Sequence, residues 1–294
     1  MGAQFFKRMK TLKIGIIGSG VLGGALGYCL KQKGAELTGI SGRNAAKVQK
    51  SARFIGLPAL DLEELVVQSR QIFLTVPDSA IAGLAEQIAG LPVNGRHKVL
   101  IHTSGALPAR EMAAAYLRGY ALLSLHPLQS FADLELAVKN LPGSYLALEG
   151  DEEALVYGEK IGELLGGKLL RLASQEKVFY HLAGVMASNY WVTLVGVAGK
   201  LMERAGIPEE EGIKALRPIM QGTLHNLLHL SPAQALTGPI ARGDCETVIR
   251  HQEALQERCP EFLNLYRELK NHTIELARKK GGLNEKTIRA LSED

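Results

Sequence analysis

Short apolar runs alternate with helical patterns along the first half of the chain, which predicts βαβ units and a parallel sheet. The apolar runs have strand length, and between them apolar residues recur at helical spacing. We expect strands at 12–17, 36–40, 71–76, 98–103, 121–125, 145–148 and 168–172. We expect the intervening helices at 21–33, 44–52, 79–89, 109–117 and 152–165.

Beyond residue 173 the pattern changes to helices without further strands. We therefore predict an α/β protein with a doubly wound parallel sheet in residues 1–173 and an all-α domain in residues 174–294. The helices of the second domain are expected near 175–204, 209–229, 245–256, 260–280 and 284–291.

The segment 182–199 has no charged residue and reaches the lower length limit for a membrane-spanning helix. It also contains Ser188, Asn189, Thr193 and three glycines, which favours a core helix that other helices surround. We therefore expect no membrane partner.

Composition narrows the class of protein further. The chain has 294 residues, a formal net charge of only +4 and basic residues spread along its length, so we expect two domains and no nucleic-acid partner. Cys29, Cys245 and Cys259 have no zinc-ligand spacing, which predicts neither a disulfide framework nor a metal site.

Segment 1–13 lacks the apolar stretch of a signal peptide, so we expect a cytoplasmic protein. Met9 is an alternative start.

A glycine-rich motif follows the first predicted strand and opens a helix. In such motifs the first glycine permits a tight turn, the second lets the backbone approach a pyrophosphate, and the third lets helix and strand pack closely. Glycine-rich turns also occur without ligands, but the flanking strand and helix favour a Rossmann-type dinucleotide site. The residues of the motif are Gly18, Ser19, Gly20, Val21, Leu22 and Gly23.

The end of the second strand indicates which dinucleotide binds. NAD sites place an Asp or Glu there to hold the ribose hydroxyls, whereas this chain has Ser41, Arg43 and Asn44. A hydroxyl, a guanidinium and an amide suit a 2′-phosphate, which favours NADP (NADPH) over NAD. The alternative is a plain turn with Asn44 as a helix N-cap, and Asn44 could serve both purposes.

Three further strand ends carry polar residues, and ligands of open α/β sheets bind beyond the carboxyl ends of the strands. These ends are Thr-Val-Pro-Asp at 75–78, His-Thr-Ser-Gly at 102–105 and the segment that begins at His126. Ordinary turn chemistry is the alternative explanation for the first two. The candidate cofactor contacts among them are Val76, Pro77 and Thr103.

Several motifs taken together resemble a bacterial family. They are 18–23, Thr-Ser-Gly at 103–105, His-Pro-Leu-Gln-Ser-Phe at 126–131, Tyr-His at 180–181 with Ser-Asn-Tyr at 188–190, and 238–244. The family is described as Rossmann-like, NADP- or deazaflavin-dependent oxidoreductases with a C-terminal domain of unknown function. The resemblance covers nearly the whole chain and leaves the substrate open.

More distantly, the layout is similar to 6-phosphogluconate, 3-hydroxyisobutyrate and prephenate dehydrogenases, ketopantoate reductase and pyrroline-5-carboxylate reductase. The resemblance implies a 6-phosphogluconate dehydrogenase-like fold, NADP as the cofactor, and a homodimer packed through the C-terminal helices.

Several of those relatives carry a Lys early in the first helix of the second domain and an Asn four residues later. Here Lys177 occupies the first place and His181 the second. At about 100° per residue, four positions of this helix lie within roughly 60° of one another, and Asn189 joins them only if the helix bends or the site is broad. The four are Lys177, His181, Gly184 and Ser188.

The resemblance implies hydride transfer between a nicotinamide and a carbonyl or imine carbon of a small, anionic substrate. Lys177 would donate and accept the proton, and His181 would share or orient it. Ser104 and His126 would hold the polar end of the substrate. The alternative is a solvent-facing lysine beside a core histidine.

The candidate substrate contacts are Ser188, Asn189 and Arg242, the last in a segment that separates two helices. Two functions stay open: an NADP-dependent oxidoreductase, or a non-catalytic NADP-binding sensor or scaffold, which the histidine at 181 favours. A deazaflavin-dependent enzyme rests on the family description alone.

Overall fold

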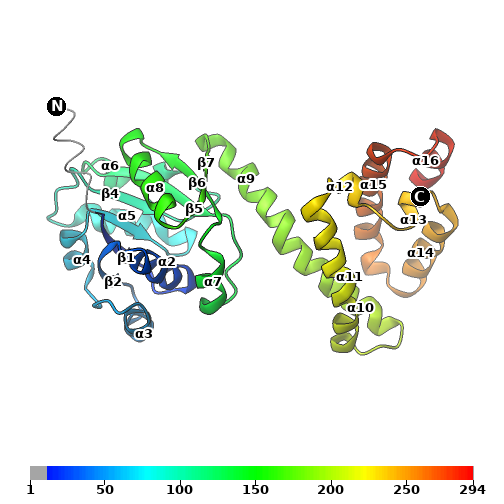
Figure 1. The fold of residues 1–294 in the computed structure, drawn as a ribbon, viewed down its shortest axis with the longest axis horizontal. Helices are drawn as coiled ribbons and strands as arrows, with labels where there is room; N and C mark the ends of the chain where they lie inside the picture. The colour runs from blue at the N-terminus through cyan, green and yellow to red at the C-terminus, as the bar shows by residue number, and fades with distance from the viewer. Residues whose placement is uncertain (1–11, 294) are drawn as a thin grey trace. The chain divides into compact units, whose positions relative to one another are not determined.

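The computed structural model describes residues 12–293 (Figure 1). Met1 and Met9, the two candidate starts, lie outside this range. The chain divides into two compact units, of which unit 1 ends at Asn189 and unit 2 begins at Tyr190. The predicted boundary between functional domains at residue 173 stays a prediction.

Unit 1 is built on one sheet with the strand order β2-β1-β3-β4-β5-β6-β7. Its first five strands pair in parallel, as the sequence predicts. The strands are β1 (Lys13–Ile17), β2 (Glu36–Ser41), β3 (Gln71–Leu74), β4 (Val99–His102), β5 (Ala121–Pro127), β6 (Tyr145–Gly150) and β7 (Lys168–Arg171).

The sixth strand departs from the expected parallel sheet. β6 runs antiparallel to β5, and Pro127 pairs with Leu146. The connection between the two strands therefore begins and ends at the same edge of the sheet, and a parallel pairing would need a crossover to the opposite edge. β7 then pairs with β6 in parallel.

Helices cover both faces of the sheet (Figure 1), which confirms the doubly wound α/β fold. Side chains of β1 alternate between the two buried layers, with Ile14 and Ile16 on one side and Ile17 on the other. The first layer contains α2 (Val21–Gln32), α3 (Ala45–Ile55), α7 (Leu134–Asn140) and α8 (Glu152–Leu164). The second contains α4 (Leu62–Gln68), α5 (Ile81–Gly90), η2 (Ala109–Met112) and α6 (Ala113–Tyr116).

Two helices of unit 1, α4 and α7, are not among the elements predicted from the sequence. Each has seven residues, about two turns, and so short a segment shows little helical periodicity. Both begin at an aspartate whose side chain accepts a hydrogen bond from the backbone, Asp61 in α4 and Asp133 in α7. These caps are a local signal that a search for long helices overlooks.

Unit 2 is all helical in its described residues. Its buried core comes from four helices, with Ile240, Val248, Ile274 and Ile288 as contributors from successive helices. The elements are α10 (Tyr190–Arg204), α11 (Glu209–His229), α12 (Pro232–Ala235), α13 (Pro239–Arg242), α14 (Cys245–Arg258), η5 (Pro260–Phe262), α15 (Leu263–Lys280) and α16 (Glu285–Ser292).

The expectation of a fully surrounded core helix over 182–199 is wrong for the single chain. The helical stretch Ser174–Arg204 is long and apolar enough to cross a membrane by length and composition, and only 6% of its most apolar window is buried. Within unit 2, α10 packs on α11, where a Cβ on Gly212 would lie 2.5 Å from the Met202 Cβ. Gly199, which faces Ile213 and Glu209 of α11, is the only buried residue of α10.

Candidate functional site

The glycine motif between β1 and α2 has three conformationally distinct glycines. Gly18 has φ +126°, and a Cβ there would lie 2.3 Å from the Thr75 carbonyl oxygen. A Cβ on Gly23 would lie 2.1 Å from the Gly18 carbonyl oxygen. Gly20 instead faces open space, with nothing within 4 Å of its Cβ position. Gly18 and Gly23 therefore serve the turn, whereas Gly20 leaves the backbone accessible to a ligand.

The N-terminus of α2 suits an anion. Gly20 is the N-cap, no side chain caps the helix, and its first turn has no acidic residue. The N–H groups of the first turn point out of the helix without intrahelical acceptors, and the helix dipole favours negative charge there. These features fit the pyrophosphate of a dinucleotide.

The end of β2 borders the glycine motif. The Gly18 N–H donates to the Ser41 carbonyl oxygen at 2.9 Å, and the Ser51 hydroxyl on α3 donates to the Ser19 carbonyl oxygen at 3.1 Å. Ser41 is buried and Arg43 is exposed. Asn44 caps α3 by accepting from the Lys47 N–H at 3.0 Å, so its amide NH₂ remains available. The first turn of α3 has no acidic residue, and this set of donors fits a 2′-phosphate.

The other predicted cofactor contacts continue along the same edge of the sheet. The Thr75 hydroxyl donates to the Gly18 carbonyl oxygen at 3.0 Å, which ties the end of β3 to the glycine motif. Val76 is half-buried and Pro77 exposed directly after it. The buried Thr103 points its hydroxyl at the Leu74 carbonyl oxygen, 3.5 Å away.

Residues 102–108 form a loop that internal hydrogen bonds hold in place. The buried His102 accepts from the Ser104 N–H through Nδ1, at 3.2 Å. Nε2 therefore carries the proton and donates to the Pro108 carbonyl oxygen at 3.0 Å. The Ser104 hydroxyl donates to Asp78 at 2.7 Å and accepts from the Leu107 N–H at 3.0 Å. Ser104 therefore orders the loop, and its contact with a substrate stays a prediction.

Lys177 lies at the start of α9 (Lys177–Gly184) and is 1% exposed. Its Nζ donates to the Ser124 hydroxyl at 2.7 Å and to the Ser104 carbonyl oxygen at 3.3 Å. Burial lowers its pKa to about 8, and the carboxylates of Glu149 and Asp78 act in the opposite direction. The solvent-facing lysine of the alternative reading is thereby excluded.

Strand register relates this lysine to the glycine motif. Ile17 pairs with Leu74, Leu74 with His102, and His102 with Ser124. The serine that holds Lys177 therefore lies in the same row of the sheet as the residue before Gly18. Both features consequently lie at the carboxyl edge of the sheet, where ligands of open α/β folds bind.

A second cluster joins the end of β5 to α9. The His126 Nδ1 lies 2.9 Å from the Tyr180 hydroxyl oxygen, and the ring centroids of His126 and His181 are 6.3 Å apart. A Cβ on Gly105 would lie 2.9 Å from the His126 Nε2 and 2.8 Å from the His181 Cδ2. Glycine at 105 thus lets two imidazoles approach the backbone. Burial lowers the pKa of His126 to about 4, and the charges of Lys177 and His181 act in the same direction.

Three residues of this site were not predicted from the sequence to be site residues. Ser124 is a polar residue inside an otherwise apolar strand, which is a detectable signal. Tyr180 lies three residues after Lys177 and therefore on the same helix face. Glu149 is buried and accepts from the Ala109 N–H at 2.7 Å and from the Ser174 hydroxyl at 2.6 Å. Its position near the end of an apolar strand contains no local signal for that role.

The remaining predicted substrate contacts lie outside this cluster. Val185–Asn189 forms a π-helical turn, which advances by roughly 80° per residue and therefore brings Asn189 to within about 30° of Lys177 around the helix. Ser188 is half-buried and Asn189 exposed. Arg242 is exposed in unit 2 between Gly238, with φ +94°, and Gly243, with φ +73°. The contacts of Ser188, Asn189 and Arg242 with a substrate stay predictions.

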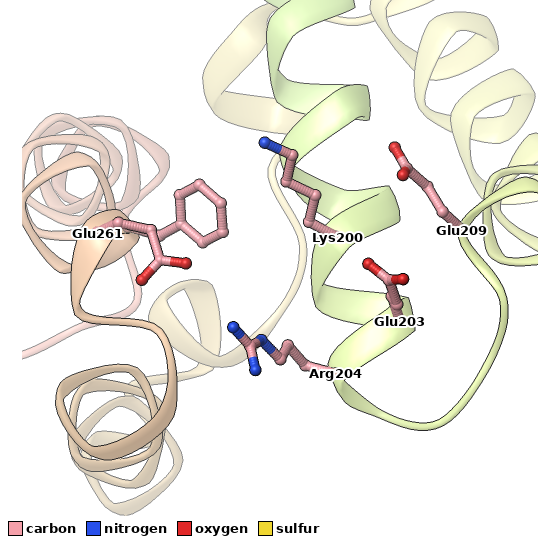
Figure 2. Close-up of a pocket in the computed structure, with 6 residues that line it drawn as sticks. Lys200, Glu203, Arg204, Glu209 and Glu261 are labelled. Atoms are coloured by element: carbon pink, nitrogen blue, oxygen red, sulfur yellow. The ribbon is translucent and has the colours of Figure 1, made fainter.

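A hollow of about 460 Å³ lies on unit 2 (Figure 2). Its lining mixes both signs of charge, with two basic and three acidic residues around one aromatic ring, and contains no predicted site residue. The lining residues are Lys200, Glu203, Arg204, Glu209, Glu261 and Phe262. This mixture fits neither an anion nor a nucleotide, and we assign the hollow no function.

The sheet order and the glycine motif define the class of the protein: a Rossmann-like α/β domain followed by a helical region. Family profiles agree, because residues 5–127 match the Rossmann-like domain and residues 144–273 match the domain of unknown function DUF2520. The chain is thus a Rossmann-like protein with a DUF2520 domain at its C-terminal side, which confirms the expected domain combination.

Solved structures of similar fold cover nearly the whole chain. Protein TM1727 from Thermotoga maritima is 28% identical with a TM-score of 0.72, over 91% of this chain and 99% of that chain. A candidate NADP oxidoreductase from Bacteroides fragilis, BF3122, is 21% identical with a TM-score of 0.72, over 92% and 98%. A reductive aminase from Aspergillus terreus, solved with NADPH and ethyl levulinate, is 19% identical with a TM-score of 0.64, over 96% and 98%. A sequence search of curated proteins found no match.

Because His102 is buried and neutral, we expect acid to lower the free energy of unfolding. Burial lowers its pKa from 6.5 to about 4, so between these pH values the unfolded chain binds a proton that the folded chain excludes. The free energy of unfolding should therefore fall as the pH drops from about 6.5 to about 4, by up to about 3 kcal/mol for this residue. In His102→Gln, which keeps a nitrogen donor for the Pro108 carbonyl, the slope should be clearly shallower.

Denaturant unfolding followed by circular dichroism across this pH range measures the slope. The control is His272→Gln, which replaces an exposed histidine and should leave the slope unchanged. A wild-type slope in His102→Gln would contradict the assignment of a buried neutral imidazole.

Proposed function

We propose that the protein is an NADP-dependent oxidoreductase that transfers a hydride between the nicotinamide and a small, anionic carbonyl/hydroxy or imine substrate. The proposal rests on one observation: the buried Lys177 amine is hydrogen-bonded to Ser124, which lies in the same row of the sheet as Ile17, the residue before the glycine motif. A buried amine that is hydrogen-bonded on two sides is a proton donor and acceptor next to a dinucleotide site. The NADPH-bound reductive aminase of similar fold supports the choice of cofactor.

Backbone N–H groups of the glycine motif would hold the pyrophosphate, and Ser41, Arg43 and Asn44 would hold the 2′-phosphate. Val76, Pro77 and Thr103 would border the remainder of the cofactor. When bound, NADP supplies or accepts the hydride.

Lys177 donates the proton that the substrate takes up during reduction and accepts it in the reverse reaction. Two of the three ammonium protons are directed at the Ser124 hydroxyl and the Ser104 carbonyl, which leaves one for a substrate atom. During reduction the carbonyl oxygen takes this proton, and the amine becomes neutral. The pKa of about 8 keeps both protonation states accessible near neutral pH, so the reverse transfer is also open.

The cofactor assignment predicts a preference for NADPH that depends on Arg43. In Arg43→Ala, loss of a charge-assisted hydrogen bond to the 2′-phosphate should raise the Kd for NADPH by roughly 10- to 100-fold. The weaker binding of NADH should stay unchanged, because NADH has no 2′-phosphate. Calorimetric titration of both nucleotides measures these constants. Arg53→Ala removes an exposed charge from the last turn of α3, the helix that follows Arg43, and is the control. Equal affinity of the wild type for NADPH and NADH would refute the assignment.

The proton assignment predicts a loss of turnover without a loss of cofactor binding. Lys177→Ala should lower kcat for NADPH-dependent reduction by about 10²- to 10⁴-fold, with an unchanged Kd for NADPH. In the wild type the reduction rate should fall above about pH 8, because the ammonium form of Lys177 loses its proton there.

NADPH consumption over a panel of carbonyl and imine acids provides the assay, and the exposed Lys286→Ala is the control. Tight NADPH binding without turnover of any panel member would favour the non-catalytic sensor or scaffold.

We further propose that two copies of the chain associate through α10 and α11. Five large apolar side chains of α10 and four of α11 are 36–73% exposed, which amounts to roughly 800 Å² and matches one side of a standard interface. The only buried residues of the two helices are Gly199 and Gly212, whereas helices of this kind gain most of their stability from a packed apolar face. A second copy presents the same face, so a two-fold pairing covers both at once.

Light scattering coupled to size-exclusion chromatography tests the pairing. The wild type should have twice the chain mass at micromolar concentration, and Val192→Glu/Leu228→Glu should have the mass of one chain. These two side chains are 73% and 70% exposed, so their replacement leaves the packing within the chain largely intact. Leu117→Glu, at an 83% exposed position of unit 1, is the control. A monomeric wild type would rule out the pairing.

A further inference from the structure

The hydroxyl of Tyr180 has one acceptor within the described chain, the His126 Nδ1 at 2.9 Å. The two rings meet edge to face, with centroids 5.5 Å apart and an interplanar angle of 89°. Burial raises the pKa of Tyr180 to about 12, so the phenol keeps its proton at neutral pH. Nδ1 is the acceptor in reach of this phenolic proton, so the arrangement that satisfies the hydroxyl has it donating to Nδ1, with the ring proton of a neutral His126 on Nε2.

The surroundings of His126 keep the imidazole uncharged. Burial lowers its pKa to about 4. The titratable groups around it come from three elements: Lys177 and His181 on α9, Asp78 after β3, and His102 at the end of β4. Of these, Asp78 favours the imidazolium, and its carboxylate is already hydrogen-bonded to Ser104. At neutral pH the Nε2–H is therefore a neutral donor.

This donor lies against the same peptide unit as the Lys177 amine. The Nζ donates to the Ser104 carbonyl oxygen at 3.3 Å, and the His126 Nε2 lies 2.9 Å from the position of a Cβ on the next residue, Gly105. No described residue accepts a hydrogen bond from Nε2. A charged donor and a neutral donor therefore flank one peptide unit at the carboxyl edge of the sheet.

We propose that His126 is an uncharged hydrogen-bond donor, through Nε2–H, to the carbonyl or imine group of the substrate, and that Tyr180 is the positioning residue that fixes this tautomer. The proposal rests on the proposed oxidoreductase function and adds a second group to it. His126 keeps its proton throughout, and the proton that the substrate consumes comes from the Lys177 Nζ. A neutral donor polarises the acceptor without adding a second full charge beside the lysine.

The tautomer is observable without any turnover. Long-range ¹H–¹⁵N correlation spectra of protein labelled with ¹⁵N-histidine distinguish a protonated from an unprotonated ring nitrogen, and the missing signals of His126→Gln assign the residue. In the wild type we expect a protonated Nε2 and an unprotonated Nδ1 from about pH 8 down to about pH 5. In Tyr180→Phe, which keeps the ring and removes the donor, the Nδ1–H form should become populated.

Kinetics then test the donor. His126→Ala should lower kcat by about 10²-fold, whereas His126→Gln, whose side-chain amide supplies an N–H, should recover most of that loss. Tyr180→Phe should lower kcat by about tenfold with little change in KM. The control is Tyr145→Phe, whose hydroxyl is on an exposed residue of β6 and whose loss should change neither readout.

Different results would overturn the role of Tyr180, the donor role of His126 and the proposed oxidoreductase function. A wild-type spectrum with Nδ1 protonated, or one that Tyr180→Phe leaves unchanged, would overturn the role of Tyr180 even if the protein turns over a substrate. Equal losses of kcat in His126→Gln and His126→Ala would overturn the donor role. If the wild type turns over no member of the substrate panel, the donor role is overturned together with the oxidoreductase function, whereas the spectra still decide the tautomer.

Discussion

A buried amine constrains the rest of unit 1. Lys177 is almost without solvent contact, and an amine in such a place destabilises the fold unless protein groups replace the water that it loses. The Ser124 hydroxyl and the Ser104 carbonyl oxygen do so. They come from neighbouring parts of the sheet edge, so the amine joins the start of α9 to β5 and to the loop after β4. The carboxylate of Glu149 adds opposite charge nearby.

The loop after β4 is ordered for the same reason. His102 bonds to the Ser104 N–H and the Pro108 carbonyl oxygen, and the Ser104 hydroxyl donates to Asp78. These hydrogen bonds hold the loop that carries the Ser104 carbonyl, which Lys177 contacts. Gly105 follows directly, and the absence of a side chain lets His126 and His181 lie against the backbone. Lys177, Tyr180 and His181 of α9 thereby lie beside the His126 imidazole at the end of β5. Burial shifts the pKa values of Lys177, His126 and Tyr180, and groups with shifted pKa values at the ligand-binding edge of a sheet are typical of a functional site.

The two units differ in how they bury apolar surface. Unit 1 has a sheet covered on both faces and two well-filled cores. In unit 2 the buried core comes from α13 to α16, while α10 and α11 leave large apolar side chains exposed. The charge-free pattern of 182–199 indicates that other helices pack on this segment, but it does not indicate which ones. Composition shows how much apolar surface a helix has and not which segment contacts it.

The amino-acid sequence by itself determined the order of strands and helices, the doubly wound α/β fold and the glycine motif. Each of these depends on local periodicity or on single residues. Gly18 has a backbone conformation that no other residue adopts easily, and a Cβ on Gly23 would meet the Gly18 carbonyl oxygen. The reversal of β6 and the short helices α4 and α7 were missed, because pairing direction depends on distant segments and seven residues show little periodicity.

Within the site, only the tertiary structure decided which polar groups meet. Lys177 and His126 stood out in the sequence by their positions, but Ser124, Tyr180 and Glu149 became partners of the site through strand register and helix packing. The sequence contains the donors and acceptors of a buried network, whereas their pairing is set by contacts between residues that are tens of positions apart in the chain.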